Sequence, residues 1–239
     1  METRFCRSAS LLGPEAITHL HDRCVLLFGL GGVGSYVAEA LARTGVGHLI
    51  LVDHDTVSLS NINRQIIALQ STVGRLKTEV TKERLLDINP AMRVDTYPLF
   101  VTEESAATLP LSSCDYLVDA IDTVAAKLFL AEYAYRHQIP IISAMGAGNK
   151  LDPTLFEVAD INQTSVCPLA RTMRAQLRKR GVPHLKVVYS KELPKAPLPN
   201  GELKGGRPSP GSLAYVPSVM GLIMAGEIIR DLTEAHNEV

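Results

Sequence analysis

The first 150 residues alternate between short apolar runs and longer segments with helix-forming character. The apolar runs predict strands at 24–28, 48–52, 93–97, 115–120 and 140–144. The segments between them predict helices at 34–43, 73–87 and 124–137. Buried parallel strands form continuous apolar runs, and each pair needs a crossover helix. The pattern therefore predicts an α/β fold, a Rossmann-like doubly wound, mainly parallel sheet with helices on both faces.

The pattern changes towards the C-terminus. The apolar stretch 213–229 contains Pro217, two glycines and Glu227, and its continuous part is shorter than the roughly 20 residues of a membrane span. We expect a buried helix or a subunit contact there, and no membrane span. Residues 194–210 are rich in proline and glycine and predict a loop. Near the N-terminus, Pro14 favours the first turn of a short helix.

The first apolar run leads directly into a glycine-rich turn. It reads Val25-Leu26-Leu27-Phe28-Gly29-Leu30-Gly31-Gly32-Val33-Gly34-Ser35, which joins four apolar residues to G-x-G-x-x-G. A buried strand, a tight turn and a helix start bind phosphate, because glycine lets oxygens approach the backbone and unbonded N–H groups attract negative charge. Asp53 follows about 20 residues later, where a carboxylate accepts hydrogen bonds from a ribose. The turn predicts a nucleotide site.

Three charged residues further along indicate which nucleotide binds. Arg64 and Lys77 add two cations, and Asp122 ends a later strand, at the edge where open α/β sheets keep their ligands. Two cations suit the β and γ phosphates and a carboxylate suits magnesium, so the set fits ATP with Mg2+ better than NAD. Taken singly, Arg64 could be a surface charge, Lys77 a solvated helix residue and Asp122 a helix N-cap. Their occurrence together favours the functional interpretation.

Several motifs together resemble one superfamily. They are residues 29–35, Asp53-His54-Asp55, Leu59-Ser60-Asn61-Ile62-Asn63-Arg64-Gln65, Gly74-Arg75-Leu76-Lys77 and Asp119-Ala120-Ile121-Asp122. Here the chain is similar to the ThiF/MoeB/ubiquitin-activating superfamily, whose members use ATP and magnesium to adenylate a carboxylate. The resemblance implies these roles: Asp53 binds the ribose, Asn61 and Arg64 bind phosphates, Lys77 stabilises the leaving pyrophosphate, and Asp122 positions the metal.

The same resemblance implies more of the site and an assembly. The nucleotide site would also include Gly29, Gly31, Gly32, Gly34, Ser35, Asp55 and Gln65. The protein would be a homodimer, and an N-terminal arginine, Arg7 or in its place Arg4, would reach into the partner's ATP. We expect one adenylating domain over 1–239. It would comprise a lead-in (1–23), a nucleotide-binding core (24–150) and a substrate and dimer region (151–239).

Further matches point to one branch of the superfamily. Residues 39–47, 119–122, 146–148, 152–153, 160–161, 164 and 168–170 are similar to the tRNA threonylcarbamoyladenosine dehydratases. This branch implies an ATP-dependent enzyme that adenylates the carboxylate of threonylcarbamoyladenosine beside the anticodon and promotes its cyclisation, with release of AMP and pyrophosphate. The alternative is an activator of a small sulfur-carrier or ubiquitin-like protein of the thiamine or molybdopterin type. A nucleotide-sensing module is a third interpretation. An NAD-dependent dehydrogenase is weaker, because it leaves the charged residues without roles.

Charge and cysteine content bear on the partners. The net charge of −1 gives no overall preference for a polyanion, but residues 171–207 carry ten basic residues against two glutamates. This segment is either a tRNA contact or a solvated helix face followed by a loop. The cysteines (Cys6, Cys24, Cys114 and Cys167) form no C-x-x-C, which argues against structural zinc and a disulfide framework and favours a cytoplasmic location. Cys167 is either a small buried residue or a thiol like the one that forms a thioester or persulfide with the protein substrate in sister branches. A sulfur-relay protein is a further candidate partner.

Overall fold

The computed structural model describes residues 3–196, 198, 203–204 and 207–237. These residues form a seven-stranded sheet in the order β3-β2-β1-β4-β5-β7-β6 and a separate hairpin of β8 and β9. The strands are β1 (Cys24–Phe28), β2 (His48–Val52), β3 (Arg93–Tyr97), β4 (Tyr116–Asp119), β5 (Ile141–Ala144), β6 (Phe156–Asp160), β7 (Lys186–Ser190), β8 (Leu203–Lys204) and β9 (Arg207–Pro208). In the large sheet β6 is antiparallel to β7, and every other pair is parallel. The predicted Rossmann-like α/β fold is confirmed.

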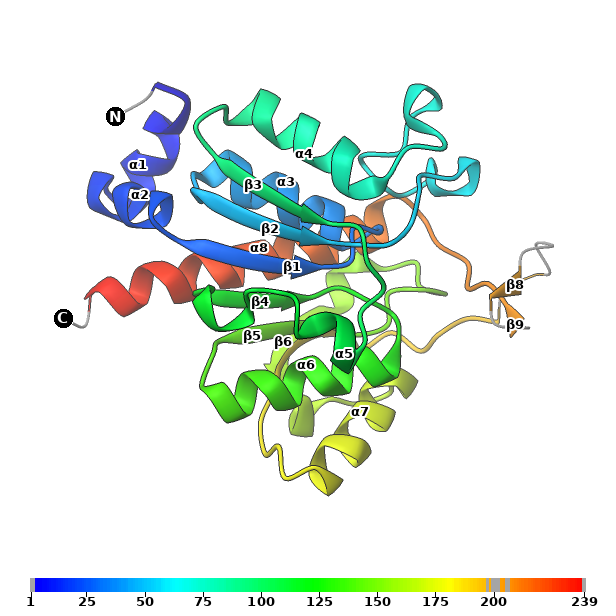
Figure 1. Cartoon of the computed structure of the whole chain (residues 1–239). Coiled ribbons are helices and arrows are strands. Elements are labelled where there is room, and N and C mark those ends of the chain that lie inside the picture. Colours follow the sequence, from blue (N-terminus) through cyan, green and yellow to red (C-terminus); the bar gives the residue numbers. More distant parts are fainter. Residues whose placement is uncertain (1–2, 197, 199–202, 205–206, 238–239) are drawn as a thin grey trace.

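Helices cover both faces of this sheet (Figure 1). On one side lie α3, α4 and α8, and on the other lie α5, α6 and α7. The α-helices are α1 (Cys6–Leu12), α2 (Pro14–His21), α3 (Gly34–Thr44), α4 (Lys77–Ile88), α5 (Glu103–Ala106), α6 (Val124–His137), α7 (Pro168–Lys179) and α8 (Tyr215–Asn237). Short 3-10 helices lie at Thr3–Phe5, Leu59–Asn61, Gln70–Thr72, Leu111–Ser113, Pro153–Leu155 and Ile161–Gln163.

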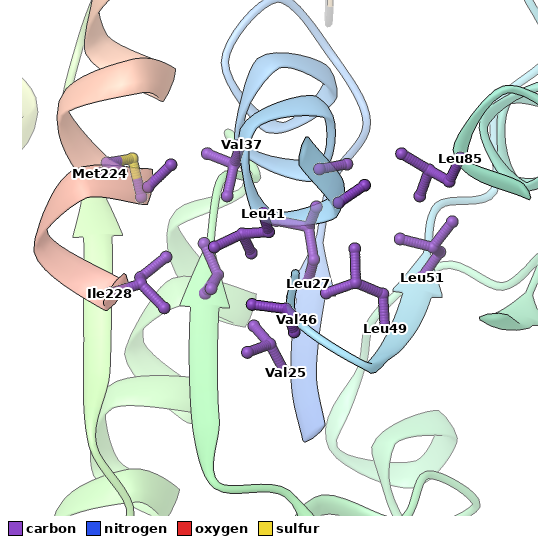
Figure 2. Packing of buried hydrophobic residues seen from close by; sticks show 14 of the residues in the cluster. Val25, Leu27, Val37, Leu41, Val46, Leu49, Leu51, Leu85, Met224 and Ile228 are labelled. Carbon is purple, nitrogen blue, oxygen red and sulfur yellow. The ribbon is translucent and has the colours of Figure 1, made fainter. Parts of the chain in front are cut away.

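The core forms because alternate residues of each central strand enter opposite layers. On one face, Val25 and Leu27 of β1 pack with Leu41 of α3, and Leu85 of α4 and Met224 of α8 complete the cluster (Figure 2). The intervening residues of β1 and β2 pack against α5 and α6 in a second cluster. Strands that are buried on both faces must be apolar throughout, which explains the continuous runs in the sequence.

Some boundaries differ from the sequence prediction. The helix predicted over 73–87 begins four residues later, at Lys77. Gly74 adopts a left-handed φ of 89°, and Thr56 and Leu76 form an isolated bridge, so this stretch belongs to a turn. The strands predicted at 115–120 and 140–144 are shorter by one or two residues.

The two ends of the chain contain more structure than the pattern predicts. In the lead-in, α1 precedes the predicted helix at Pro14, and Phe5, Ile17 and Leu20 enter the core. After residue 150 the chain adds β6, α7 and β7. Because β7 pairs with β5, the sheet continues across residue 150.

The predicted C-terminal helix is present as α8. It buries Val216, Met220, Met224 and Ile228 and leaves Leu222 49% exposed. Within the described residues, no helix combines the length and apolar character needed to cross a membrane. Of the loop predicted at 194–210, residues 197, 199–202 and 205–206 lie outside the described residues, and the described part includes β8 and β9.

Candidate nucleotide-binding site

The candidate site lies where the strand order reverses. The chain leaves β1 towards β2 on one side, while β4 lies on the other side of β1, so the loops after β1 and β4 diverge at this point. Such a switch point opens a crevice at the carboxyl ends of the strands. Gly29 directly follows β1, has a φ of 89° and lies close to the end of β4. A Cβ at this position would lie 2.7 Å from the Ala120 carbonyl oxygen. Only glycine fits this approach.

The glycine turn presents backbone donors at the start of α3. Within the described chain, the N–H groups of Gly31, Gly32, Val33 and Gly34 make no backbone hydrogen bond. Beside Gly31 there is open space, since an added Cβ would meet nothing nearer than Gln65 Nε2 at 3.9 Å. The Ser35 hydroxyl, by contrast, is buried and donates to the Gly31 carbonyl oxygen at 2.7 Å. The turn can therefore bind a phosphate through its backbone N–H groups, and the Ser35 side chain stabilises the turn.

Substitutions at two of these glycines separate binding from folding. A Cβ at Gly34 would lie 1.8 Å from the Gly29 carbonyl oxygen, so we expect Gly34→Ala to destabilise the protein by at least about 2 kcal/mol. Gly31→Ala should unfold near the wild-type urea midpoint yet weaken nucleotide binding, because its Cβ would enter the space in front of the N–H groups. Urea titration and nucleotide titration check the pair. Equal loss of stability in both variants would contradict this division of roles.

A chain of hydrogen bonds links the turn to Lys77. Asp53 accepts the Leu30 N–H at 2.6 Å with one oxygen and the Asp55 N–H at 2.8 Å with the other. Asp55 in turn accepts Lys77 Nζ at 2.7 Å. The Lys77 side chain is only 6% exposed and begins α4, where the helix dipole disfavours a cation. The Asp55 carboxylate offsets the cost of holding this buried amine at a helix N-terminus.

The segment after β2 brings two more predicted residues, Arg64 and Gln65, to the turn. Arg64 Cγ would lie 3.4 Å from a Cβ on Gly32, and Gln65 lies against Gly31. The Arg64 guanidinium donates to the Ser60 carbonyl and to Asn63 Oδ1, both at 2.9 Å. Asn61 is buried and accepts the Ser58 N–H at 3.2 Å. The buried Gln65 Oε1 has no hydrogen-bond partner in the described structure, and it could accept a hydrogen bond from a ligand beside the turn.

Asp122 lies at the same edge, between β4 and α6, and is exposed. Beneath it is a buried network that the sequence pattern did not reveal. Lys127 is 0% exposed, and its Nζ lies 2.8 Å from Asp119 Oδ2 and donates to the Ala144 carbonyl at 2.8 Å and to the Ile121 carbonyl at 3.2 Å. Ser143 also donates to Asp119, at 2.5 Å. These bonds hold the 119–122 turn from below. In the sequence, Lys127 looks like an ordinary charge of an amphipathic helix.

The acidic groups of this edge differ in their suitability for a metal. Asp53, His54 and Asp55 place ligand atoms within 4.8 Å of one another. Asp53 accepts two backbone N–H groups that hold the glycine turn, and Asp55 is paired with Lys77. Asp122 is an exposed carboxylate at the same edge of the sheet. One carboxylate plus phosphate oxygens is a usual Mg2+ ligand set, so the residues present fit this ion.

The remaining predicted residues lie away from this edge within one chain. Arg7 is exposed on α1, which lies with α2 at the edge where the strands begin (Figure 1). Arg4 donates to the Ile88 carbonyl at the end of α4. Of the eight described cationic side chains in the basic segment 171–207, four make ion pairs or backbone contacts, namely Arg174, Arg180, Lys186 and Lys191. On α7, Arg171, Arg178 and Lys179 are exposed.

Cys167 is buried and caps the N-terminus of α7, where its Sγ accepts the Ala170 N–H at 3.5 Å. Lys150 is buried nearby and donates to the Glu192 carbonyl oxygen. Burial lowers the pKa of the Lys150 amine, and Cys167 and Glu192 oppose that change. The packing favours the structural interpretation of this cysteine. On β1, Cys24 Sγ lies 3.6 Å from Cys114 Sγ, and both are thiols.

The fold and this edge of the sheet define a nucleotide-binding α/β protein with a phosphate site at its switch point. The ThiF family model matches residues 5–239, and the chain belongs to the ThiF family. The tRNA threonylcarbamoyladenosine dehydratase of Bacillus subtilis (strain 168) is 42% identical over 239 residues, covering 96% of this chain and 94% of that protein.

Two crystal structures are similar over nearly the whole chain. The Escherichia coli tRNA N6-threonylcarbamoyladenosine dehydratase in complex with AMP matches with a TM-score of 0.90 and 34% identity, covering 99% of this chain and 96% of that one. Its complex with ATP matches with a TM-score of 0.89, again at 34% identity, covering 98% and 96%. The predicted superfamily is confirmed, and these relatives carry the name of the predicted branch.

Proposed function

We propose that this protein is an ATP-dependent tRNA threonylcarbamoyladenosine dehydratase. The observation that carries the proposal is the set of four N–H groups at the start of α3, with Arg64 and Gln65 packed against the same glycines. Relatives of that name cover the chain almost from end to end, and one of them binds ATP and AMP in a similar fold. ATP adenylates the substrate carboxylate, and the neighbouring carbamoyl group then displaces AMP to close a ring.

In this proposal the residues of the edge divide the work on ATP. The glycine turn holds phosphate oxygens through its N–H groups, and Asp53 accepts a ribose hydroxyl while it keeps the turn in place. Asn61 and Arg64 hold phosphates. Lys77 shifts from Asp55 to the leaving pyrophosphate and offsets its charge. No enzyme nucleophile is needed, because ring closure within one molecule depends chiefly on positioning.

We propose Asp122 as the protein ligand of Mg2+. When bound, the ion would neutralise charge on the phosphates as the carboxylate attacks. The Asp119–Lys127–Ser143 network beneath it keeps the Asp122 loop in one position. This chain's own contribution is therefore an oriented carboxylate.

The proposed substrate is a tRNA in the cytoplasm. The exposed cations of α7 (Arg171, Arg178 and Lys179) are suited to phosphate contacts, which should weaken steeply with salt. We propose no role for Cys167 in a sulfur relay, since it packs as a helix cap. A protein partner of that kind would have to use another surface.

Product analysis tests the proposal. Purified protein is incubated with ATP, Mg2+ and threonylcarbamoylated tRNA, and the nucleoside and nucleotide products are measured by mass spectrometry. We expect one AMP per modified adenosine that loses one water, and no AMP with unmodified tRNA. AMP formation that requires a small protein with a Gly-Gly tail, and not RNA, would instead support the sulfur-carrier activator.

We further propose a homodimer in which Arg7 completes the partner's ATP site. Since α1 lies at the opposite edge of its own sheet, Arg7 can serve a phosphate site only across subunits. Inactive Arg7→Ala and Lys77→Ala proteins, mixed and allowed to exchange subunits, should recover about one quarter of wild-type turnover, because one site of each mixed dimer is intact. An inactive mixture whose subunits demonstrably exchange would contradict the shared site.

A further inference from the structure

A groove lies beside the nucleotide site on the sheet face covered by α5 and α6. Its volume is about 430 Å3, and it runs between the 100–103 segment and α6. Its inner end is Thr123, the residue after Asp122. Its outer end is formed by Arg136, His137 and Arg180. None of the roles described above uses this groove.

Aromatic rings line the groove along α6. Phe129, Tyr133 and His137 are four residues apart and therefore share one helix face. The ring centroids of Tyr133 and His137 are 4.1 Å apart and stacked, and those of Phe129 and Tyr133 are 6.0 Å apart. On the other wall Phe100 is 48% exposed, and its ring lies edge-on to His54, which follows Asp53. Phe129 and Tyr133 are partly buried against the core, and Phe100 and His137 are exposed, so both walls of the groove offer ring surface that suits stacking against a nucleobase.

The outer end of the groove carries a positive balance. Glu132 pairs with Arg136 at 2.5 Å and with Arg180 at 2.7 Å, so one carboxylate serves two guanidiniums. Both arginines keep about half or more of their side-chain surface, 68% and 44% respectively. The Glu103 carboxylate on the facing wall can accept a hydrogen bond from an amino group of a base. The aromatic rings within the groove suit stacking with bases, and the guanidinium groups at its outer end suit the phosphates that join those bases.

We propose that this groove binds an unpaired nucleobase of the anticodon loop, adjacent to the modified adenosine. The base stacks on the rings of α6, and Arg136 and Arg180 contact the phosphate beside it. The proposal rests on the proposed function for the identity of its RNA. The groove begins one residue after Asp122, so a loop whose adenosine reaches the adenylation site brings its neighbouring nucleotide to the groove. RNA is commonly recognised through such splayed loop bases.

Three substitutions on α6 test the stacking. Tyr133→Leu keeps an apolar side chain without a ring, Tyr133→Phe keeps the ring, and Tyr135→Leu removes an aromatic residue that is 49% exposed outside the groove. For an anticodon stem-loop RNA we expect Tyr133→Leu to raise Kd about tenfold, with Tyr133→Phe and Tyr135→Leu near wild type. The KM for ATP should stay unchanged in all three. Unchanged RNA affinity in folded Tyr133→Leu would overturn the proposal and would be the expected result if a protein partner occupied the groove.

Photo-crosslinking separates this proposal from the proposed function. A stem-loop with 4-thiouridine beside the target adenosine should crosslink to the 100–103 segment or to α6. Crosslinks at these positions in a protein that shows no dehydratase turnover would support base binding in the groove and contradict the proposed function. Normal turnover with crosslinks confined to other surfaces would reject the groove alone. Arg136→Gln, on an exposed side chain, gives a second affinity measurement if Tyr133→Leu does not fold.

Discussion

Lys77→Ala should lower kcat/KM for ATP-dependent turnover by about 100- to 1000-fold, because it removes a cation positioned to offset charge on the leaving pyrophosphate. In the structure this amine is held by Asp55 at 2.7 Å, with the Lys77 side chain 6% exposed and that of Asp55 50% exposed. A half-exposed carboxylate regains water when its partner is lost, so we expect a stability change of only about 1 kcal/mol or less. Steady-state kinetics and urea unfolding measure the two effects separately.

Lys82→Ala is the matched control for this experiment. Lys82 lies on the same helix, α4, and is partly exposed. It should leave both the kinetics and the unfolding midpoint near wild type. Equal activity of the two alanine variants would show that Lys77 takes no part in the reaction and only closes the turn between β2 and α4.

Lys127→Met should destabilise the fold by about 3–5 kcal/mol, the cost of leaving a buried charge without its partner. Asp119 is 1% exposed, and Lys127 Nζ is its cationic neighbour at 2.8 Å. The two carbonyl oxygens that Lys127 contacts would also lose a donor. Urea unfolding measures the loss, and Lys179→Met, at an exposed lysine on α7, is the control that should cost little.

A double substitution distinguishes the charge effect from a packing effect. In Lys127→Met with Asp119→Asn, no buried charge is left unpaired, so much of the lost stability should return. Additive losses in the double variant would mean that the network acts through shape and not through charge. If the network positions Asp122, Lys127→Arg, which keeps the cation, should retain more Mg2+ affinity than Lys127→Met. Both variants are compared under conditions in which they are fully folded.

The sequence predicted the elements around the nucleotide site well and those of the last third poorly. β1, the glycine turn and α3 are specified locally, because an apolar run and closely spaced glycines have few other structures available. β6 carries a mixed burial pattern at the sheet edge, and β7 joins β5 only through a long connection. Neither gives a periodic signal of its own.

The site was predictable as a set of residue types and not as a set of contacts. Asp53 and Lys77 were identified by position, but their bonds to Leu30 and Asp55 depend on how the loops after β1 and β2 meet. Lys127 was missed because its burial comes from β4 and β5, which are distant in the chain. Arg7 lies at the opposite edge because α1 lies beside the starts of the strands, which no local pattern indicates.

One isotope measurement tests the central claim, that the substrate carboxylate attacks ATP and forms an acyl adenylate. Threonylcarbamoylated tRNA labelled with 18O in both carboxylate oxygens is converted in a single turnover with unlabelled ATP. The bond between the carboxylate oxygen and phosphorus survives ring closure, so the account predicts that the AMP released carries one 18O. Unlabelled AMP, or 18O in inorganic phosphate formed together with ADP, would contradict it.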